Sequence, residues 1–161
     1  MKIAIGCDHR GYAAKRRLLP MLERDGHDVV DVGCEDTAAC DYPDYAIPVA
    51  RAVARGEADV GILLDGSGVG MSVAANKIPG VRAALVHDEV TARRSREHNH
   101  CNVLCLAADL LSEEQVGQIV GSFLGAQFAA GRHQRRVDKV IEIDFETRGA
   151  SVLGEKVAKT A

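Results

Sequence analysis

The chain has 161 residues, of which 47% are hydrophobic and 27% charged, and its formal net charge is −3. This length suits one domain with a full hydrophobic core and is short for two typical domains. The acidic balance argues against nucleic acid and membrane surfaces as partners, because both are polyanions. Apolar runs stay far below the roughly 20 residues that cross a bilayer. The start, "MKIAIGCDHRG", turns polar too early for a signal peptide, so we expect a cytoplasmic protein.

The cysteines indicate a reducing environment. The chain holds Cys7, Cys34, Cys40, Cys101 and Cys105. The number is odd and no CxxC pair occurs, which favours free thiols over a disulfide framework. His98, His100 and Cys101 resemble half of a metal site, but no second half follows at zinc spacing. We therefore expect no metal.

Short apolar segments alternate with amphipathic segments along the whole chain. The predicted strands are 2–7, 28–33, 60–65, 82–86 and 102–107. Most of them lack a polar alternation, as is typical of parallel strands covered on both faces. The predicted helices are 10–25, 45–57, 69–77, 88–98 and 112–130. Pro20 falls inside the first of these helices, so we expect that helix to kink or to restart there.

The helix predicted over 112–130 has the clearest pattern. Its apolar residues recur on one face: Val116, Ile119, Val120, Phe123 and Leu124. The preceding "SEEQ" forms a capping box in which Ser112 is the N-cap residue and Gln115 reaches back to it.

Five consecutive strand–helix repeats predict an α/β fold. We expect a three-layer αβα sandwich around a Rossmann-like, right-handed, five-stranded parallel sheet. Ligands of such sheets bind at the carboxyl ends of the strands, in the loops that lead into helices. Polar residues stand at these places: "CDHRG" after the first strand, "DGSGVG" after the third, "VHDE" after the fourth and "AAD" after the fifth.

The C-terminal part does not fit the repeat. Residues 131–146 can form a helix with Val137, Val140 and Ile141 on one face. Such a helix has no place in the core of a completed sheet, so we expect it at a subunit interface. Residues 147–161 show no strong pattern. We therefore divide the chain into a domain over 1–146 and a tail over 147–161 that is poorly ordered or lies on a partner.

The glycine-rich turn after the third strand is typical of an anion site. Glycines let a ligand approach the backbone, and a helix N-terminus offers unpaired N–H groups. "GSGVG" lacks the lysine of a P-loop, and it stands on the wrong strand for the dinucleotide motif GxGxxG. A plain strand-to-helix turn would leave Ser67 and Asp65 unexplained. A site for phosphate or for a developing oxyanion is the preferred interpretation.

Other polar residues are weak signals when taken singly. His98 could be a surface histidine at the end of a helix, where the helix dipole stabilises it. Asp8 and His9 end the first strand, and the carboxylate of Asp41 in "DYPDYA" could simply cap the next helix.

Together these segments resemble the ribose-5-phosphate isomerase type B family, which includes galactose-6-phosphate isomerases. The resemblance runs from Met1 to about Val137. Six segments contribute to it, in order: "IAIGCDHRG", "DYPDYA", "GSGVGMSVAANKIPGVRAAL", "SREHN", "NVLCL" and "GRHQRR". The resemblance implies a homodimer whose active sites are shared between subunits, with a tetramer left open.

The resemblance also implies a reaction. The family isomerises aldose and ketose sugar phosphates without a metal or cofactor, through an enediolate, and ribose 5-phosphate to ribulose 5-phosphate is the leading candidate. A histidine opens the sugar ring, and a base moves a proton between C1 and C2. The N–H groups of the glycine turn stabilise the enediolate, whose charge appears only during the reaction.

Matching residues take their roles from the resemblance. His98 matches the ring-opening histidine, Asn99 a substrate-binding amide and Asp8 a carboxylate bonded to the sugar, while Tyr42 forms a wall. The matching turn residues are Gly66, Ser67, Gly68 and Gly70. The phosphate end combines His9 with Arg132, His133 and Arg136 from the second subunit. Arg132 and Arg136 lie four residues apart on a helix and can grip one anion together.

Position 65 departs from the family pattern. Many members have a cysteine base there, and another branch has a glutamate six residues later; here these positions hold Asp65 and Met71. No other residue of the loop can take a proton, so Asp65 is the predicted base. The alternative is that Asp65 only fixes the turn or binds a hydroxyl group.

Position 109 is the second departure, since the family usually has a phosphate-binding arginine where this chain has Asp109. A carboxylate removes a favourable charge and adds a repulsive one. Asp109 could point away and cap the helix at 112, or the substrate could be a different pentose or hexose, phosphorylated or free. A non-catalytic sugar-binding module remains a further alternative, although His98 beside Asn99 favours an enzyme. The misplaced glycine motif disfavours a dehydrogenase.

Overall fold

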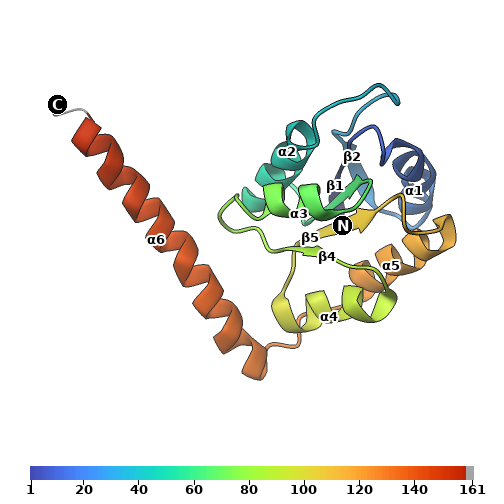
Figure 1. The fold of residues 1–161 in the computed structure, drawn as a ribbon. Coiled ribbons are helices and arrows are strands. Elements are labelled where there is room, and N and C mark those ends of the chain that lie inside the picture. The colour runs from blue at the N-terminus through green and yellow to red at the C-terminus, as the bar shows by residue number, and fades with distance from the viewer. Residues whose placement is uncertain (159–161) are drawn as a thin grey trace.

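The computed structural model describes the backbone of residues 1–158 and the side chains of residues 1–146. Its centre is one sheet of five strands in the order β2-β1-β3-β5-β4, and every neighbouring pair is parallel (Figure 1). The strands are β1 (Lys2–Cys7), β2 (Asp28–Asp31), β3 (Val60–Asp65), β4 (Ala83–Leu85) and β5 (Val103–Ala107). The predicted five-stranded parallel sheet is confirmed.

Helices cover both faces of the sheet and complete three layers (Figure 1). They are α1 (Tyr12–Arg24), α2 (Pro43–Ala54), α3 (Val69–Ala75), α4 (Glu89–Asn99), α5 (Glu113–Gly125), the 3₁₀ turn η1 (Gly131–His133) and α6 (Gln134–Ala158). Helices α1, α4 and α5 pack on one face, and α2 and α3 pack on the other. This is the predicted αβα sandwich. None of the helices in the described part of the chain is long and apolar enough to cross a membrane.

The alternation of side chains along the strands divides the core into two clusters. Ile3, Ile5 and Phe123 belong to the cluster under α1, α4 and α5, whereas Val49 and Leu63 belong to the cluster under α2 and α3. Every residue of β3 is buried. A central parallel strand must be apolar on both faces, and this explains the continuous apolar run in the sequence. The five cysteines are free thiols, and four of them are buried.

Two helix predictions need correction. The helix predicted over 112–130 keeps its capping box but ends at Gly125. Beyond it, Phe128 stacks on His100 with ring centroids 4.5 Å apart, and the Ala129 N–H donates to the Glu97 carbonyl. These contacts with α4 and the residue after it pull the chain out of the helix. In α1, Pro20 does not restart the helix, which runs as one element from Tyr12 to Arg24.

Helix α6 contacts the domain through its N-terminal part, as far as Asp144. Val137 is buried, and Asp144 accepts a hydrogen bond from the Gly80 N–H at 2.7 Å, but the helix then extends away from the sheet (Figure 1). Val140 is 51% exposed. The backbone is helical to Ala158, past the predicted boundary at 146, and the division of the chain at that boundary stays a prediction. Residues 159–161 of that predicted tail lie outside the described residues, and the placement of α6 at a subunit interface stays a prediction.

Candidate active site

Two carboxylates stand side by side at the carboxyl edge of the sheet. Strands β1 and β3 are neighbours, Cys7 is paired with Leu64, and the Asp8 N–H donates to the Leu64 carbonyl at 3.2 Å. Asp8 therefore follows β1 directly beside Asp65, the last residue of β3. Both line an open cavity of about 540 Å³. Its other lining residues are Tyr42, Gly66, Ser67, Val69, Gly70, Asp109 and Leu110.

Asp65 is tied to the glycine turn that follows it. Its side chain is buried, with the residue 5% exposed. Oδ1 accepts hydrogen bonds from the N–H groups of Ser67, at 3.0 Å, and of Gly68, and Oδ2 accepts one from Met71 at 3.2 Å. The carboxylate thus takes several of the amides that we expected to be free for an enediolate. Asp65 organises this turn, whatever else it does.

The turn requires glycine at position 68. Gly68 has φ = 76°, in the left-handed region that favours glycine. A Cβ there would clash with the Leu85 side chain and would lie 3.2 Å from the Leu106 carbonyl carbon. At Gly70, a Cβ would lie 3.1 Å from the ring of Tyr42. The glycines therefore let the turn approach strand β5 and the Tyr42 ring closely.

Replacing Gly68 with alanine is expected to lower the free energy of unfolding by about 2 to 4 kcal/mol, from left-handed strain and overpacking together. Urea unfolding followed by circular dichroism measures the change. Gly70→Ala is the control, because its Cβ meets only the ring of Tyr42, which is 38% exposed and can move. Equal losses in the two variants would contradict this account of Gly68.

Asp8 is held in a different way from Asp65. Its Oδ1 accepts hydrogen bonds from the N–H groups of Arg10, at 2.8 Å, and Gly11, at 3.1 Å. Its Oδ2 lies 4.0 Å from Nδ1 of His9. The Cys40 N–H donates to that same Nδ1 at 3.3 Å. Because Nδ1 then acts as an acceptor, the neutral His9 ring carries its proton on Nε2.

The predicted histidine group forms a second cluster. His98 and Asn99 end α4, and they line a cavity of about 680 Å³ together with His133 and Arg136. The rings of His98 and His133 stack with centroids 4.3 Å apart and planes 2° apart. Burial lowers the pKa of His133, and the nearby His98, Arg132 and Arg136 lower it further.

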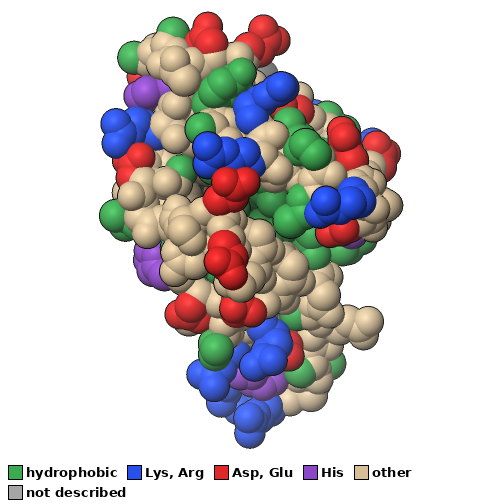
Figure 2. All heavy atoms as spheres, turned by 90° about the vertical axis from the view of Figure 1, so that its right-hand side faces the viewer, with side chains coloured by type: hydrophobic (Ala, Val, Ile, Leu, Met, Phe, Trp, Pro, Cys, Tyr) green, Lys and Arg blue, Asp and Glu red, His purple; other side chains and the backbone are tan. Residues whose placement is uncertain are grey.

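The structure places the predicted site residues in two groups within one chain. The cavity lined by Asp8, Tyr42 and Asp65 shares no lining residue with the cavity lined by His98 and His133. Figure 2 shows basic side chains gathered at the lower end of the molecule, where α6 begins. The exposed arginines of this segment are Arg132, Arg135 and Arg136. Among residues 1–146, no cluster of His, Cys, Asp and Glu has the makings of a metal site.

Sequence reasoning missed the partner of Asp109. Nε and Nη2 of Arg10 donate to Oδ2 of Asp109 at 3.0 and 2.5 Å. This ion pair raises the pKa of Arg10. The hypothesis that Asp109 caps the following helix is wrong, because Ser112 and Gln115 form the cap. A signal was available in "CDHRG" and "AAD", which follow the first and last of three adjacent strands, β1, β3 and β5.

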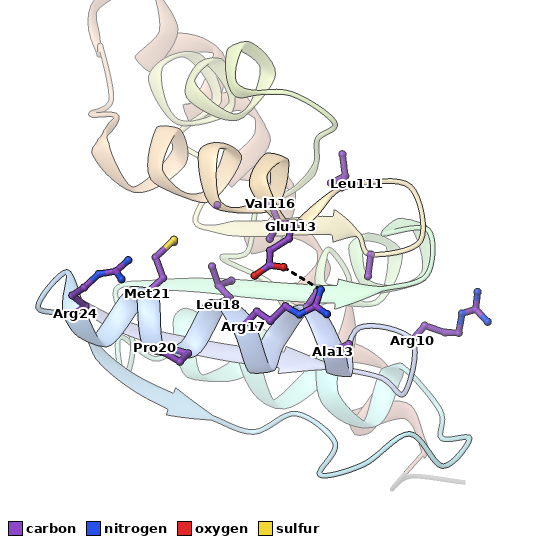
Figure 3. A pocket seen from close by; sticks show the side chains of 13 residues that line it. Arg10, Ala13, Arg17, Leu18, Pro20, Met21, Arg24, Leu111, Glu113 and Val116 are labelled. Atoms are coloured by element: carbon purple, nitrogen blue, oxygen red, sulfur yellow. Dashed lines mark ion pairs between the residues drawn. The ribbon is translucent and has the colours of Figure 1, made fainter.

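A third cavity lies apart from these groups, between α1 and α5. It measures about 390 Å³ and has apolar walls that include Leu18, Met21 and Val116 (Figure 3). Arg17 and Glu113 pair across it at 3.2 Å. Arg10 stands at one end of this groove and points away from Arg17 and Glu113 (Figure 3).

The comparisons with known proteins agree with this fold and with the resemblance in the sequence. A family model described as Ribose/Galactose Isomerase matches residues 3–140. Ribose-5-phosphate isomerase B of Escherichia coli is 45% identical over 143 residues, which cover 89% of this chain and 96% of that protein. The chain belongs to the ribose/galactose isomerase family.

Solved structures are equally similar. Ribose-5-phosphate isomerase B of Clostridium thermocellum superposes with a TM-score of 0.89 at 44% identity, over 91% of this chain and 99% of that one. Ribose-5-phosphate isomerase B of Mycoplasma genitalium, solved with bound ribulose-5-phosphate, gives a TM-score of 0.87 at 44% identity, over 90% of this chain and 97% of that one.

Proposed function

We propose that the protein is an aldose–ketose isomerase of sugar phosphates, an intramolecular oxidoreductase that interconverts ribose 5-phosphate and ribulose 5-phosphate. The observation that supports it best is the cavity at the sheet edge, where Asp8, Tyr42, Asp65 and the glycine turn meet. The chain is 44% identical, over 90% of its length, to a ribose-5-phosphate isomerase B solved with bound ribulose-5-phosphate. The site lies at the carboxyl ends of parallel strands, where such folds bind small ligands.

The proposed proton transfers use one histidine and one carboxylate. His98 opens the sugar ring as a general acid and base. Asp65 then takes the proton from C2 of the open-chain aldose, and negative charge moves to O1. The proton of the C2 hydroxyl passes to O1, and Asp65 returns its proton to C1, which leaves a ketone at C2. A base needs a free lone pair, and Oδ2 of Asp65 accepts one hydrogen bond, from Met71, which leaves acceptor capacity.

The negatively charged oxygen of the enediolate also needs a hydrogen-bond donor. Asp65 accepts hydrogen bonds from the amides of Ser67, Gly68 and Met71. The Val69 amide donates to Oγ of Ser67 at 3.3 Å. In the first turn of α3, the Gly70 amide has no acceptor among the described residues, and it lines the cavity. We assign to it the stabilisation of the developing oxyanion.

We also propose a homodimer in which the two clusters meet across the interface. The support is that one chain keeps the Asp65 cluster and the His98 cluster in separate cavities. Helix α6 extends away from its own domain with Val140 and Phe145 exposed, which suits contact with a second subunit. His9 of one subunit and Arg132, His133 and Arg136 of the other would then hold the phosphate. Pairing of dimers into a tetramer stays open.

The proposed location is the cytoplasm. The free cysteines, most of them buried, suit a reducing compartment. A sugar phosphate also carries a charge that keeps it within the compartment where it is made.

A panel of substrates tests the function. Ribose 5-phosphate, galactose 6-phosphate and the two free sugars are incubated with the enzyme, and aldose and ketose are followed by NMR. We expect the highest kcat/KM for ribose 5-phosphate. Equal kcat/KM for phosphorylated and free ribose would contradict a phosphate requirement and would favour the second candidate, an isomerase of a different sugar, which Asp109 at the cavity wall suggests.

A further inference from the structure

The cavity at the sheet edge has an unusual charge for a site that receives a phosphate. Its charged lining residues are Asp8, Asp65 and Asp109, and no lysine or arginine side chain of the described chain lines it. A sugar phosphate is a dianion near neutral pH, so three carboxylates would repel it. The proposed dimer brings Arg132 and Arg136 of the second subunit to the phosphate, and a cation of the same chain at the rim of this cavity would add to them.

The guanidinium of Arg10 lies against this wall. Its Nε and Nη2 both donate to Oδ2 of Asp109, at 3.0 and 2.5 Å. Both side chains remain accessible, at 57% for Arg10 and 38% for Asp109. An arginine has five N–H donors, and the Asp109 pair uses only those on Nε and Nη2. Nη1 makes no hydrogen bond to the described residues, so its donors are available to a second anion.

The backbone fixes where this ion pair stands. The Asp109 N–H donates to the Gly66 carbonyl at 3.1 Å, and the Ala108 N–H donates to the Asp65 carbonyl at 2.8 Å. A Cβ on Gly66 would lie 2.6 Å from Oδ2 of Asp109 and 3.5 Å from Nε of Arg10. Arg10 also follows His9 directly and donates its own N–H to Asp8. The guanidinium thus lies over the first glycine of the turn, against Asp109.

We propose that Arg10 binds the phosphate group of the substrate and that Asp109 is the positioning residue that holds its guanidinium over Gly66. This inference rests on the proposed function and adds, from the same chain, a residue that helps the site to select a phosphorylated sugar. Asp109 does not itself bind the phosphate. Its role is to orient the positive charge of Arg10, which offsets the negative charge of the cavity wall. The side chain of Arg10 points away from the groove between α1 and α5, consistent with a partner outside that groove (Figure 3).

A competing explanation is that Arg10 only neutralises Asp109. The two explanations differ in a double variant. If Arg10 only cancels the charge of Asp109, removing both charges restores phosphate binding. If Arg10 contacts the phosphate, binding stays weak when both are removed.

The test compares Arg10→Gln, Asp109→Asn and the double variant with the unmodified protein. Calorimetry with inorganic phosphate gives the dissociation constant, and steady-state kinetics with ribose 5-phosphate give KM and kcat separately. We expect Arg10→Gln to weaken phosphate binding and to raise KM by about tenfold or more, the effect of losing one charge-assisted contact. We expect kcat to change much less, and the double variant to bind as weakly as Arg10→Gln.

Arg17→Gln is the matched control, because Arg17 is 60% exposed and pairs with Glu113 away from the cavity. It is expected to leave phosphate binding unchanged. Wild-type phosphate affinity in Arg10→Gln, or its recovery in the double variant, would overturn the inference. Calorimetry does not depend on turnover, so a protein that fails to isomerise ribose 5-phosphate would refute the proposed function while the phosphate measurement still decides the role of Arg10.

Discussion

Replacing Asp65 with asparagine is expected to lower kcat by about 10³-fold, within the usual range for loss of a general base. An amide of the same shape cannot take a proton from C2. Its oxygen can still accept the hydrogen bonds from Ser67 and Gly68, so the turn keeps its main contacts. The bond from the Met71 N–H is lost, which costs about 1 kcal/mol of stability. The measurement is kcat together with deuterium incorporation into the sugar from heavy water.

Asp8→Asn is the comparison for this variant. Asp8 lines the same cavity, and its Oδ1 also accepts two backbone hydrogen bonds. It should bind a sugar hydroxyl, so we expect a raised KM and a smaller loss of kcat than in Asp65→Asn. If Asp65→Asn incorporated deuterium at nearly the wild-type rate while Asp8→Asn did not, the base would be Asp8 and Asp65 would only anchor the turn.

The sheet and its functional edge were predictable because simple rules govern them. Residues 60–65 form an apolar run, and the structure buries all of them in a central parallel strand. Loops after parallel strands meet at one edge, which predicted Asp8 and Asp65 at the same edge. The family resemblance added Tyr42, and all three residues line one cavity, while their roles in the reaction stay predictions. The capping box of Ser112 and Gln115 was also predictable, since it depends on local sequence alone.

Features that depend on contacts distant in sequence were not predictable in the same way. The residues after Gly125 favour a helix locally, but the stacking of Phe128 on His100 ends it. The glycine turn was expected to offer free amides. The carboxylate of Asp65 binds them because a side chain at the end of β3 reaches the first turn of α3.

The Arg10–Asp109 pair is a second example of the same limit. The two residues are separated by 99 positions, and each alone reads as an exposed charge. Only the adjacency of β1, β3 and β5 brings them over Gly66. A departure at position 109 was visible in the sequence, but its compensation at position 10 required the structure.

Mixing two inactive variants is expected to restore activity if each active site is shared between subunits. Asp65→Asn removes the proposed base and His98→Asn removes the ring-opening histidine. The two residues lie in separate cavities of one chain. In a mixed dimer, one site receives both substitutions and the other receives none. Random exchange of subunits makes half of the dimers mixed, so about a quarter of wild-type kcat should return.

The measurement is activity after the two variants are unfolded together and refolded, or co-expressed. Each variant treated alone is the control and should stay inactive, since none of its dimers contains an intact site. If the mixture stayed as inactive as its components while size-exclusion chromatography showed mixed dimers, Asp65 and His98 would act within one chain. His98 would then have to approach Asp65 within one chain by a movement of α4 and the segment around His133, because these elements position the histidine pair. Recovery of about a quarter of wild-type kcat would instead mean that Asp65 of one subunit and His98 of the other form each active site.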